Sequence, residues 1–195
     1  MSVGRPREFD TNQALDDALD VFWRNGYEGT SILELTEAMG INRPSLYAAF
    51  GNKEALFHKA IDRYMEIRAC HLLSALDEPT ARAVVKKLWS GNIELISNSK
   101  NPRGCFLVQS ALACGDAAES IRKEMVKRRS KCEKLLCQRL ERAIEEGDLP
   151  ADSNAEQLAK YVSTVSYGIA VQAAGGAGRK QLCEVADLAL QAFPD

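Results

Sequence analysis

The sequence lacks the signatures of several large protein classes. None of its apolar runs approaches the roughly 20 residues that span a bilayer, so we expect no membrane partner. The N-terminal stretch MSVGRPREFD is polar and does not resemble a secretory signal, which leads us to expect a cytoplasmic protein. In that compartment the six cysteines are expected as reduced thiols rather than as a disulfide framework.

Motifs that indicate catalysis are also missing. The chain has no HExxH, GxSxG, GxGxxG or phosphate-binding loop, and no pattern predicts a Rossmann sheet. The two histidines, His58 and His71, lie too far apart along one expected helix to share a metal ion. We therefore expect no enzyme, no cofactor and no metal site.

Acidic residues are absent from residues 38–52, although the whole chain has a formal net charge of −2. The acids of the first 53 residues all precede this window, within residues 8–20 and 28–37. A nucleic-acid-binding surface is marked by the distribution of charge more than by its sum, so this window is the candidate DNA surface.

The stretch of residues 31–53 has the pattern of two short helices joined at a glycine. Ser31 and Glu34 form a capping box, which marks the start of the first helix. Gly40 ends that helix where a left-handed backbone is needed, and Asn42 can cap the second helix. This is the plan of a helix-turn-helix, whose second helix enters the DNA major groove.

Five residues of the second helix are candidates for DNA contacts. Arg43 is the candidate for reading bases, because a guanidinium bonds guanine O6 and N7 and so discriminates by about 1–3 kcal/mol. Pro44 and Ala48 are candidates to contact a thymine methyl group. Ser45 and Tyr47 are candidates to bond phosphate oxygens.

Further DNA contacts are expected on both sides of these helices. Arg5 and Arg7 flank a proline and can lie in a narrow minor groove; a disordered terminus is the alternative. Thr30 and Ser31 are expected to hold a phosphate at a helix N-terminus, with plain capping equally compatible for Ser31. Lys53 opposes the dipole at its helix start, which a phosphate there would explain.

This region resembles the N-terminal DNA-binding domain of the TetR family of transcriptional repressors over about residues 10–64. The resemblance rests on Thr30-Ser31, Gly40-Ile41, Ser45-Leu46-Tyr47, Phe50 and Asn52-Lys53-Glu54-Ala55-Leu56-Phe57. Thr36 departs from the alanine usual in the family, but a threonine there can hydrogen-bond back to its own helix. The resemblance implies a homodimer on a palindromic double-stranded DNA operator, with Lys53 on the DNA backbone.

The rest of the chain repeats helical spacing to its end. Apolar positions predict further helices over about residues 53–76, 80–97, 105–114, 117–147, 154–173 and 179–193. We therefore expect an all-α protein of about nine helices. An N-terminal arm and three-helix head (residues 1–52) would precede a larger helical domain for effector binding and dimerisation (residues 53–195).

Two sets of residues in the larger domain are assigned to function. The set expected to line a pocket for a small apolar or aromatic effector is Trp89, Cys105, Phe106, Gln109 and Tyr167. Core packing is the alternative for Trp89 and for the segment after Gly104. The last two helices carry more apolar surface than one core needs, so a dimer interface is assigned to Leu158, Val162, Val165, Ile169, Leu182, Val185 and Ala189.

The expected mechanism is repression that ends when an effector moves the fourth helix and changes the spacing of the two heads. A cysteine-based redox sensor on the same scaffold is the alternative function. The pairs Cys105/Cys114 and Cys132/Cys137 do not share a helix face, so a single thiol or an intersubunit pair stays open. Cys105, near a helix start, is the candidate thiol. Activation instead of repression also stays open, as does the identity of the effector.

Overall fold

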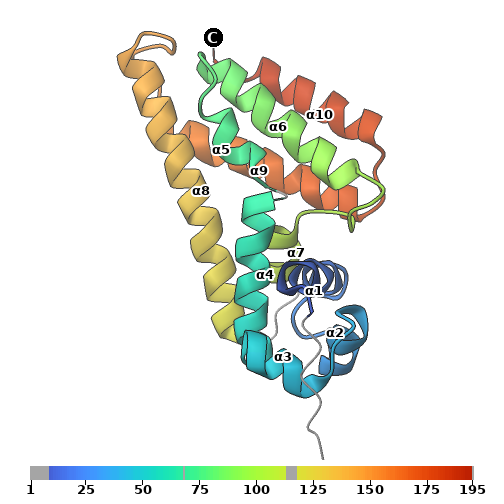
Figure 1. The fold of residues 1–195 in the computed structure, drawn as a ribbon. Helices are drawn as coiled ribbons and strands as arrows, with labels where there is room; N and C mark the ends of the chain where they lie inside the picture. The colour runs from blue at the N-terminus through green and yellow to red at the C-terminus, as the bar shows by residue number, and fades with distance from the viewer. Residues whose placement is uncertain (1–8, 68, 113–117, 195) are drawn as a thin grey trace, which may run out of the picture.

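The computed structural model describes residues 9–67, 69–112 and 118–194, and these residues form helices and loops without a strand (Figure 1). The expected all-α fold is confirmed. The ten helices of the described residues are α1 (Thr11–Asn25), α2 (Ile32–Ala38), α3 (Arg43–Phe50), α4 (Lys53–Ile67), α5 (His71–Ala75), α6 (Ala81–Ser97), α7 (Phe106–Leu112), α8 (Glu119–Glu145), α9 (Ala155–Ala174) and α10 (Arg179–Gln191).

The predicted helix-turn-helix is formed by α2 and α3. The Ser31 hydroxyl accepts the Glu34 backbone N–H and the Glu34 carboxylate accepts the Ser31 backbone N–H, which completes the capping box. Gly40 has a φ of 63°, in the left-handed region that the turn requires. The Asn42 side chain then accepts the Ser45 N–H and starts α3.

The helices form two groups that α4 and α8 connect. In Figure 1, α1, α2 and α3 lie at one end, whereas α6, α9 and α10 pack together at the other end. The long helix α8 borders both groups, and its Arg128 forms an ion pair of 2.6 Å with Asp62 of α4. None of the described helices combines the length and the apolar character that crossing a membrane requires.

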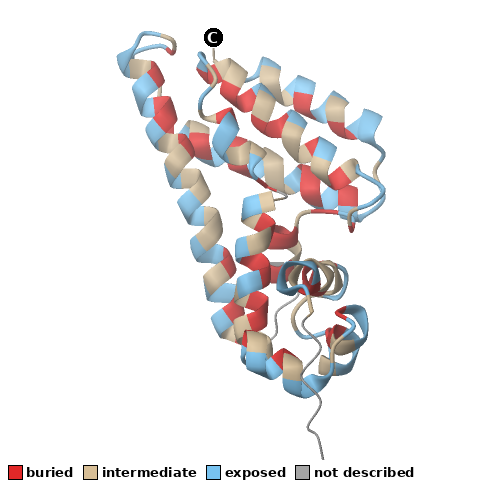
Figure 2. Ribbon diagram, viewed as in Figure 1, coloured by how far each residue is buried: buried red, intermediate tan, exposed pale blue. Residues whose placement is uncertain are grey.

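The buried residues, whose ribbon is red in Figure 2, form two core clusters. The first, which we call the head cluster, is built mainly by α1–α4, but it also contains Phe106 and Leu107 of α7 and Ile121 and Met125 of α8. The second, the C-terminal cluster, is built by α5, α6, α8, α9 and α10 and is mostly aliphatic. The buried core of the head therefore continues beyond residue 52.

One predicted helix is wrong in its extent. The expected helix over residues 53–76 is two helices, because α4 ends at Ile67 and α5 begins at His71. At the break the Ala69 N–H donates to the Tyr64 carbonyl over 2.9 Å, a contact that skips one residue more than the normal helical bond. The start of α1 is capped by the Asp10 side chain, which accepts the backbone N–H groups of Asn12 and Gln13.

Candidate nucleic-acid interface and cavity

The outer face of α3 carries the residues expected to contact DNA. Arg43, Pro44, Tyr47 and Ala48 are exposed, and Ser45 is half-buried. On the opposite face Leu46 and Phe50 are buried in the head cluster and hold the helix in place. This arrangement follows from the sequence, because the apolar residues of α3 recur four positions apart.

Arg43 and Tyr47 are engaged with each other on this face. The Arg43 Nε donates a hydrogen bond of 3.3 Å to the Tyr47 hydroxyl, and the guanidinium carbon lies 5.7 Å from the ring centroid. Within the described ranges, Arg43 forms no ion pair with a carboxylate. Its remaining guanidinium N–H groups are therefore available to an external acceptor.

The phosphate site expected at the start of α2 is only partly available. Thr30 is buried, and its hydroxyl donates to the Gly26 carbonyl over 2.7 Å, so this hydroxyl cannot reach a phosphate. Ser31 is exposed, and its hydroxyl oxygen accepts the Glu34 N–H as a cap. Arg5 and Arg7, the expected minor-groove arm, lie outside the described residues.

Lys53 has a partner within the protein that the sequence did not reveal. Its ammonium lies 4.6 Å from the centroid of the Tyr27 ring. Burial lowers the pKa of Lys53, and the carboxylates of Glu28 and Glu34 act in the opposite direction. The contact with Tyr27 ties α4 to the loop before α2 and offers a second reason, besides DNA, for a lysine at this helix start.

A cavity of about 100 Å³ lies among α4, α5, α6, α7, α8 and α9. Most of its lining is apolar and includes Leu72, Leu76, Leu88, Leu95, Leu136 and Val162. Its polar lining includes Tyr64, Asn92, Cys105, Arg129, Ser163 and Tyr167. A mostly apolar cavity with a few polar groups is typical of a small-molecule site.

Two of the five residues expected at the pocket, Cys105 and Tyr167, line this cavity. The other three do not. Trp89 packs in the C-terminal cluster and donates its indole N–H to the Val162 carbonyl over 3.2 Å. Phe106 belongs to the head cluster, and the Gln109 side chain donates to the Arg103 carbonyl over 2.9 Å.

The thiols of Cys105 and Cys132 both line the cavity. From the sequence, these two cysteines were not considered as a pair. The Cys105 Sγ lies 3.5 Å from the Tyr64 hydroxyl, and burial raises the pKa of that phenol well above its usual range. Burial also raises the pKa of the Cys132 thiol, and the nearby Cys105 adds to this effect. Cys114, which sequence reasoning compared with Cys105, lies outside the described residues.

The wall of the cavity is part of the core of the head. Tyr64 lines the cavity, and its ring centroid lies 5.0 Å from that of Trp23 and 5.5 Å from that of Phe106. The Trp23 indole N–H donates to the Gly104 carbonyl over 3.0 Å, which ties α1 to the loop that leads into α7. A ligand that displaces Tyr64 therefore acts directly on the packing of α1 and α4.

Several residues assigned to a dimer interface lie instead within the protomer. Val162, Ile169 and Leu182 are buried in the C-terminal cluster, where no second chain can reach them. The half-buried residues Leu158, Val165 and Ala189 pack against the same cluster. Val185 is 51% exposed, and Val171 of α9 and Leu188 of α10 are further exposed apolar residues.

A helix-turn-helix head packed against a larger helical domain is the architecture of a DNA-binding regulator. Residues 14–60 match the family model for bacterial regulatory proteins of the tetR family. Residues 81–185 match the tetracyclin repressor-like C-terminal domain. The chain therefore belongs to the TetR family of transcriptional regulators.

Individual relatives agree over nearly the whole chain. The transcriptional repressor ComR of Escherichia coli is 30% identical over 200 residues, which cover 100% of this chain and 93% of ComR. The repressor BdcR of Escherichia coli is 29% identical, over 97% of this chain and 92% of BdcR. A cysteine mutant of the TetR-family regulator CifR, solved with a 26bp operator DNA, is 41% identical with a TM-score of 0.93, over 97% of this chain and 100% of that chain.

Proposed function

We propose that this DNA-binding regulator is a homodimeric repressor that occupies a palindromic operator and leaves it when a small effector enters the cavity. The observation that carries the proposal is the exposed face of α3, where Arg43, Pro44, Tyr47 and Ala48 lie together. No acidic residue interrupts residues 38–52, so this face meets the phosphates without repulsion from its own helix.

Arg43 is assigned to base reading, with Tyr47 as its orienting neighbour. A guanidinium held over a tyrosine ring loses less conformational freedom when it forms a bidentate contact with guanine. Ser31, Ser45 and Lys53 are assigned to phosphates, and Pro44 and Ala48 to thymine methyl groups. Arg5 and Arg7 are assigned to an adjacent minor groove.

A homodimer follows from the geometry that palindromic DNA requires, because each half-site needs its own head. The exposed apolar residues Val171 of α9 and Val185 and Leu188 of α10 support an interface on these two helices. A regulator of this kind acts where bacterial DNA lies, so we place the protein in the cytoplasm.

Release by an effector is supported by the position of α4. Tyr64 and Met65 of α4 line the cavity, and the same helix follows α3 directly in the chain. An effector that prefers a shifted α4 would move the head and change the spacing of the two recognition helices. The affinity for the operator could then fall by at most the factor by which the effector binds the shifted state more tightly.

Selection from random DNA duplexes by the purified, reduced protein tests the proposal. A dimeric repressor enriches a palindrome whose half-sites lie about one helical turn, or a multiple of it, apart. If the refolded protein, freed of any bound ligand, again enriches no sequence at moderate salt, the proposal is wrong.

Arg43→Ala then tests base reading. We expect it to weaken binding to the selected palindrome by about 1–3 kcal/mol and to relax the preference at one half-site position. Arg24→Ala is the control, because Arg24 is exposed on α1 and pairs with Asp20. Equal losses for both variants would remove Arg43 from base reading.

A cysteine-based redox sensor is the second candidate, supported by the two thiols of Cys105 and Cys132 in one cavity. A disulfide between them would form as hydrogen peroxide is reduced to two waters, with both thiols giving up a proton and an electron. Peroxide should then lower operator affinity, a thiol reductant should restore it, and Cys132→Ser should abolish the response. A response that survives Cys132→Ser would contradict this pairing.

A further inference from the structure

One wall of the cavity carries three hydrogen-bond donors that have no acceptor among the residues the structure describes. They are Arg129 of α8 and Ser163 and Tyr167 of α9, and we call them the polar wall. Ser163 and Tyr167 lie four positions apart and so share a helix face, and the Arg129 guanidinium carbon lies 5.4 Å from the Tyr167 ring centroid. The three groups therefore converge where α8 and α9 meet the cavity.

Arg129 carries a charge that no described carboxylate neutralises. It is half-buried. In the described part of the chain its guanidinium has a ring contact with Tyr167 but no hydrogen bond and no ion pair. Glu133, one turn along α8, also lines the cavity but forms an ion pair of 2.5 Å with Lys160. The ion pairs of Arg122 and Arg128 with acids on α8 show that arginines elsewhere on this helix do find partners.

Ser163 differs from the other hydroxyl residues around it on α9. Thr164 donates to the Lys160 carbonyl over 2.8 Å and Ser166 to the Val162 carbonyl over 2.9 Å, the usual bond of such residues to their own helix. Ser163 is only 9% exposed, and within the described ranges its hydroxyl has no hydrogen bond. The Ser163 hydroxyl lies in the lining of the cavity, where a ligand can supply the acceptor.

Tyr167 completes the polar wall as a neutral donor. Burial raises the pKa of its phenol to about 12, although the charge of Arg129 acts in the opposite direction. At physiological pH the phenol therefore keeps its proton, and its O–H is not bonded to any described residue. The polar wall thus offers one positive charge and two neutral O–H donors.

We propose that the effector is a small amphipathic carboxylate, whose carboxylate binds Arg129, Ser163 and Tyr167 and whose apolar part packs against Leu72, Leu88 and Leu136. This inference rests on the proposed function, because it names the ligand of the same cavity. A single guanidinium with two hydroxyls suits a monoanion, and the nearby carboxylate of Glu133 disfavours a doubly charged phosphate.

Calorimetric titration with matched acid and amide pairs tests the charge of the ligand. The probes are octanoate, benzoate and phenylacetate, each compared with its neutral primary amide. A charge-assisted hydrogen bond in a partly buried site favours the acid by roughly tenfold to a hundredfold. We expect at least one acid to bind with this preference and to lower the affinity of the protein for its selected operator.

Arg129→Gln should remove the preference and leave the acid and its amide within about twofold of each other. Arg142→Gln is the matched control, because Arg142 is exposed on the same helix and pairs with Glu146 outside the cavity. Ser163→Ala should reduce the preference without abolishing it.

Three results would overturn the inference. They are equal affinity for acids and amides, no binding of any probe, or a preference that Arg129→Gln leaves intact. Operator binding without ligand, measured on the same samples, separates this failure from failure of the proposed function. A protein that binds its palindrome but ignores the acids remains a repressor with another effector class.

Discussion

The two tryptophans of the chain make the same kind of bond in two different regions. Trp23 of the head is 2% exposed, and Trp89 of the C-terminal cluster is 1% exposed. Each donates its indole N–H to a backbone carbonyl far away in sequence, Trp23 to Gly104 and Trp89 to Val162. Both bonds satisfy buried polar groups, so each is expected to stabilise its own region.

The two bonds differ in what they connect. The bond of Trp89 joins α6 to α9 inside the C-terminal cluster. The bond of Trp23 joins α1 of the head to the loop before α7, beside the cavity residue Cys105. The head cluster contributes Tyr64 and Leu107 to the lining of the cavity, whereas the C-terminal cluster contributes Leu88, Leu136 and Val162. The cavity lies at the boundary between two bodies, where a ligand has the greatest leverage on their relative position.

The largest effects on stability and on operator affinity are expected when each tryptophan is replaced by phenylalanine. Trp23→Phe and Trp89→Phe should each lower the free energy of unfolding by about 2–4 kcal/mol, because each removes an indole hydrogen bond and leaves a cavity where part of a buried ring was. Chemical denaturation of the dimer at fixed protein concentration measures both losses. Only Trp23→Phe should also change operator affinity severalfold, since it alone loosens α1 from the cavity wall.

Equal changes in operator affinity for the two variants would show that both tryptophans act through overall stability alone. The distinction between the two regions would then fail, even if both unfolding free energies fell as expected. Measurements well below the unfolding midpoint of the weaker variant keep the comparison free of unfolded protein.

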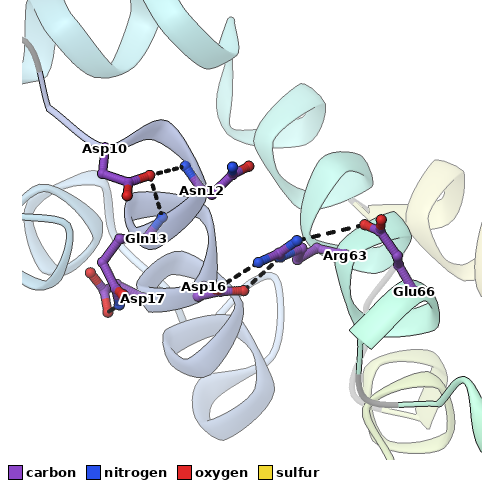
Figure 3. A network of polar contacts seen from close by, with 7 residues as sticks. All are labelled: Asp10, Asn12, Gln13, Asp16, Asp17, Arg63 and Glu66. Atoms are coloured by element: carbon purple, nitrogen blue, oxygen red, sulfur yellow. Dashed lines mark hydrogen bonds and ion pairs between the residues drawn. The ribbon is translucent and has the colours of Figure 1, made fainter.

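Two ion pairs of α4, one to α1 and one to α8, are expected to differ less in how much they stabilise the protein. Arg63 donates from two nitrogens to Asp16 of α1 over 2.8 and 2.9 Å (Figure 3), and this hydrogen bonding raises the pKa of Arg63. Arg128 of α8 pairs with Asp62, whose side chain is 63% exposed. We expect Asp16→Asn to cost about 1 kcal/mol and Asp62→Asn less than half of that, because exposed pairs are screened.

Thermal unfolding of the two variants at low and at high salt measures this difference. Asp62→Asn should lose its effect as salt rises, whereas part of the effect of Asp16→Asn should persist. If Asp62→Asn destabilises more than Asp16→Asn, then α4 is held more firmly to α8 than to the head, against the account given above.

The smallest predicted effect is the response of the head to acid. The backbone N–H and hydroxyl of Ser31 lower the pKa of Glu34 below its usual 4.5, and arginine hydrogen bonds lower those of Glu119 and Glu124. A lowered pKa in the folded state means stabilisation that is present above the usual value and is lost as pH falls through the folded value. Glu34→Gln should therefore flatten the fall in stability of the head below about pH 4.5.

Nuclear magnetic resonance of α2 amides across this pH range measures the effect locally. A Glu34→Gln protein that loses α2 at the same pH as the unchanged protein would contradict it. Glu37→Gln is the control, because Glu37 is exposed on the same helix and takes no part in the capping box.

Local signals in the sequence predicted the head well, because its ends are set by neighbouring residues. Ser31 and Asn42 each cap the helix that follows them, as expected. The break between α4 and α5 has no such signal. Residues 67–72 contain neither glycine nor proline, and the apolar pattern continues across them.

The cavity and the dimer face were harder to predict, because tertiary packing chooses among apolar faces. Trp89 and Tyr167 both lie on apolar helices, yet only Tyr167 faces the cavity. Val162 and Val185 were assigned to the same interface, but the first is buried in the protomer and the second is exposed. A helix that is apolar on several sides does not reveal from its sequence which side meets which neighbour. The sequence alone did not distinguish Arg129 from the other basic residues of α8.

Native-state hydrogen exchange tests most directly whether the head and the cavity wall form one body. In increasing denaturant, the amides of α7 should open with the same free energy as those of α1 and α4, because all three belong to the head cluster. The amides of α6, α9 and α10 should open as a second unit. If α7 instead opens with α6, α9 and α10, the cavity wall belongs to the C-terminal region, and the account of coupling through Trp23 and Tyr64 is contradicted.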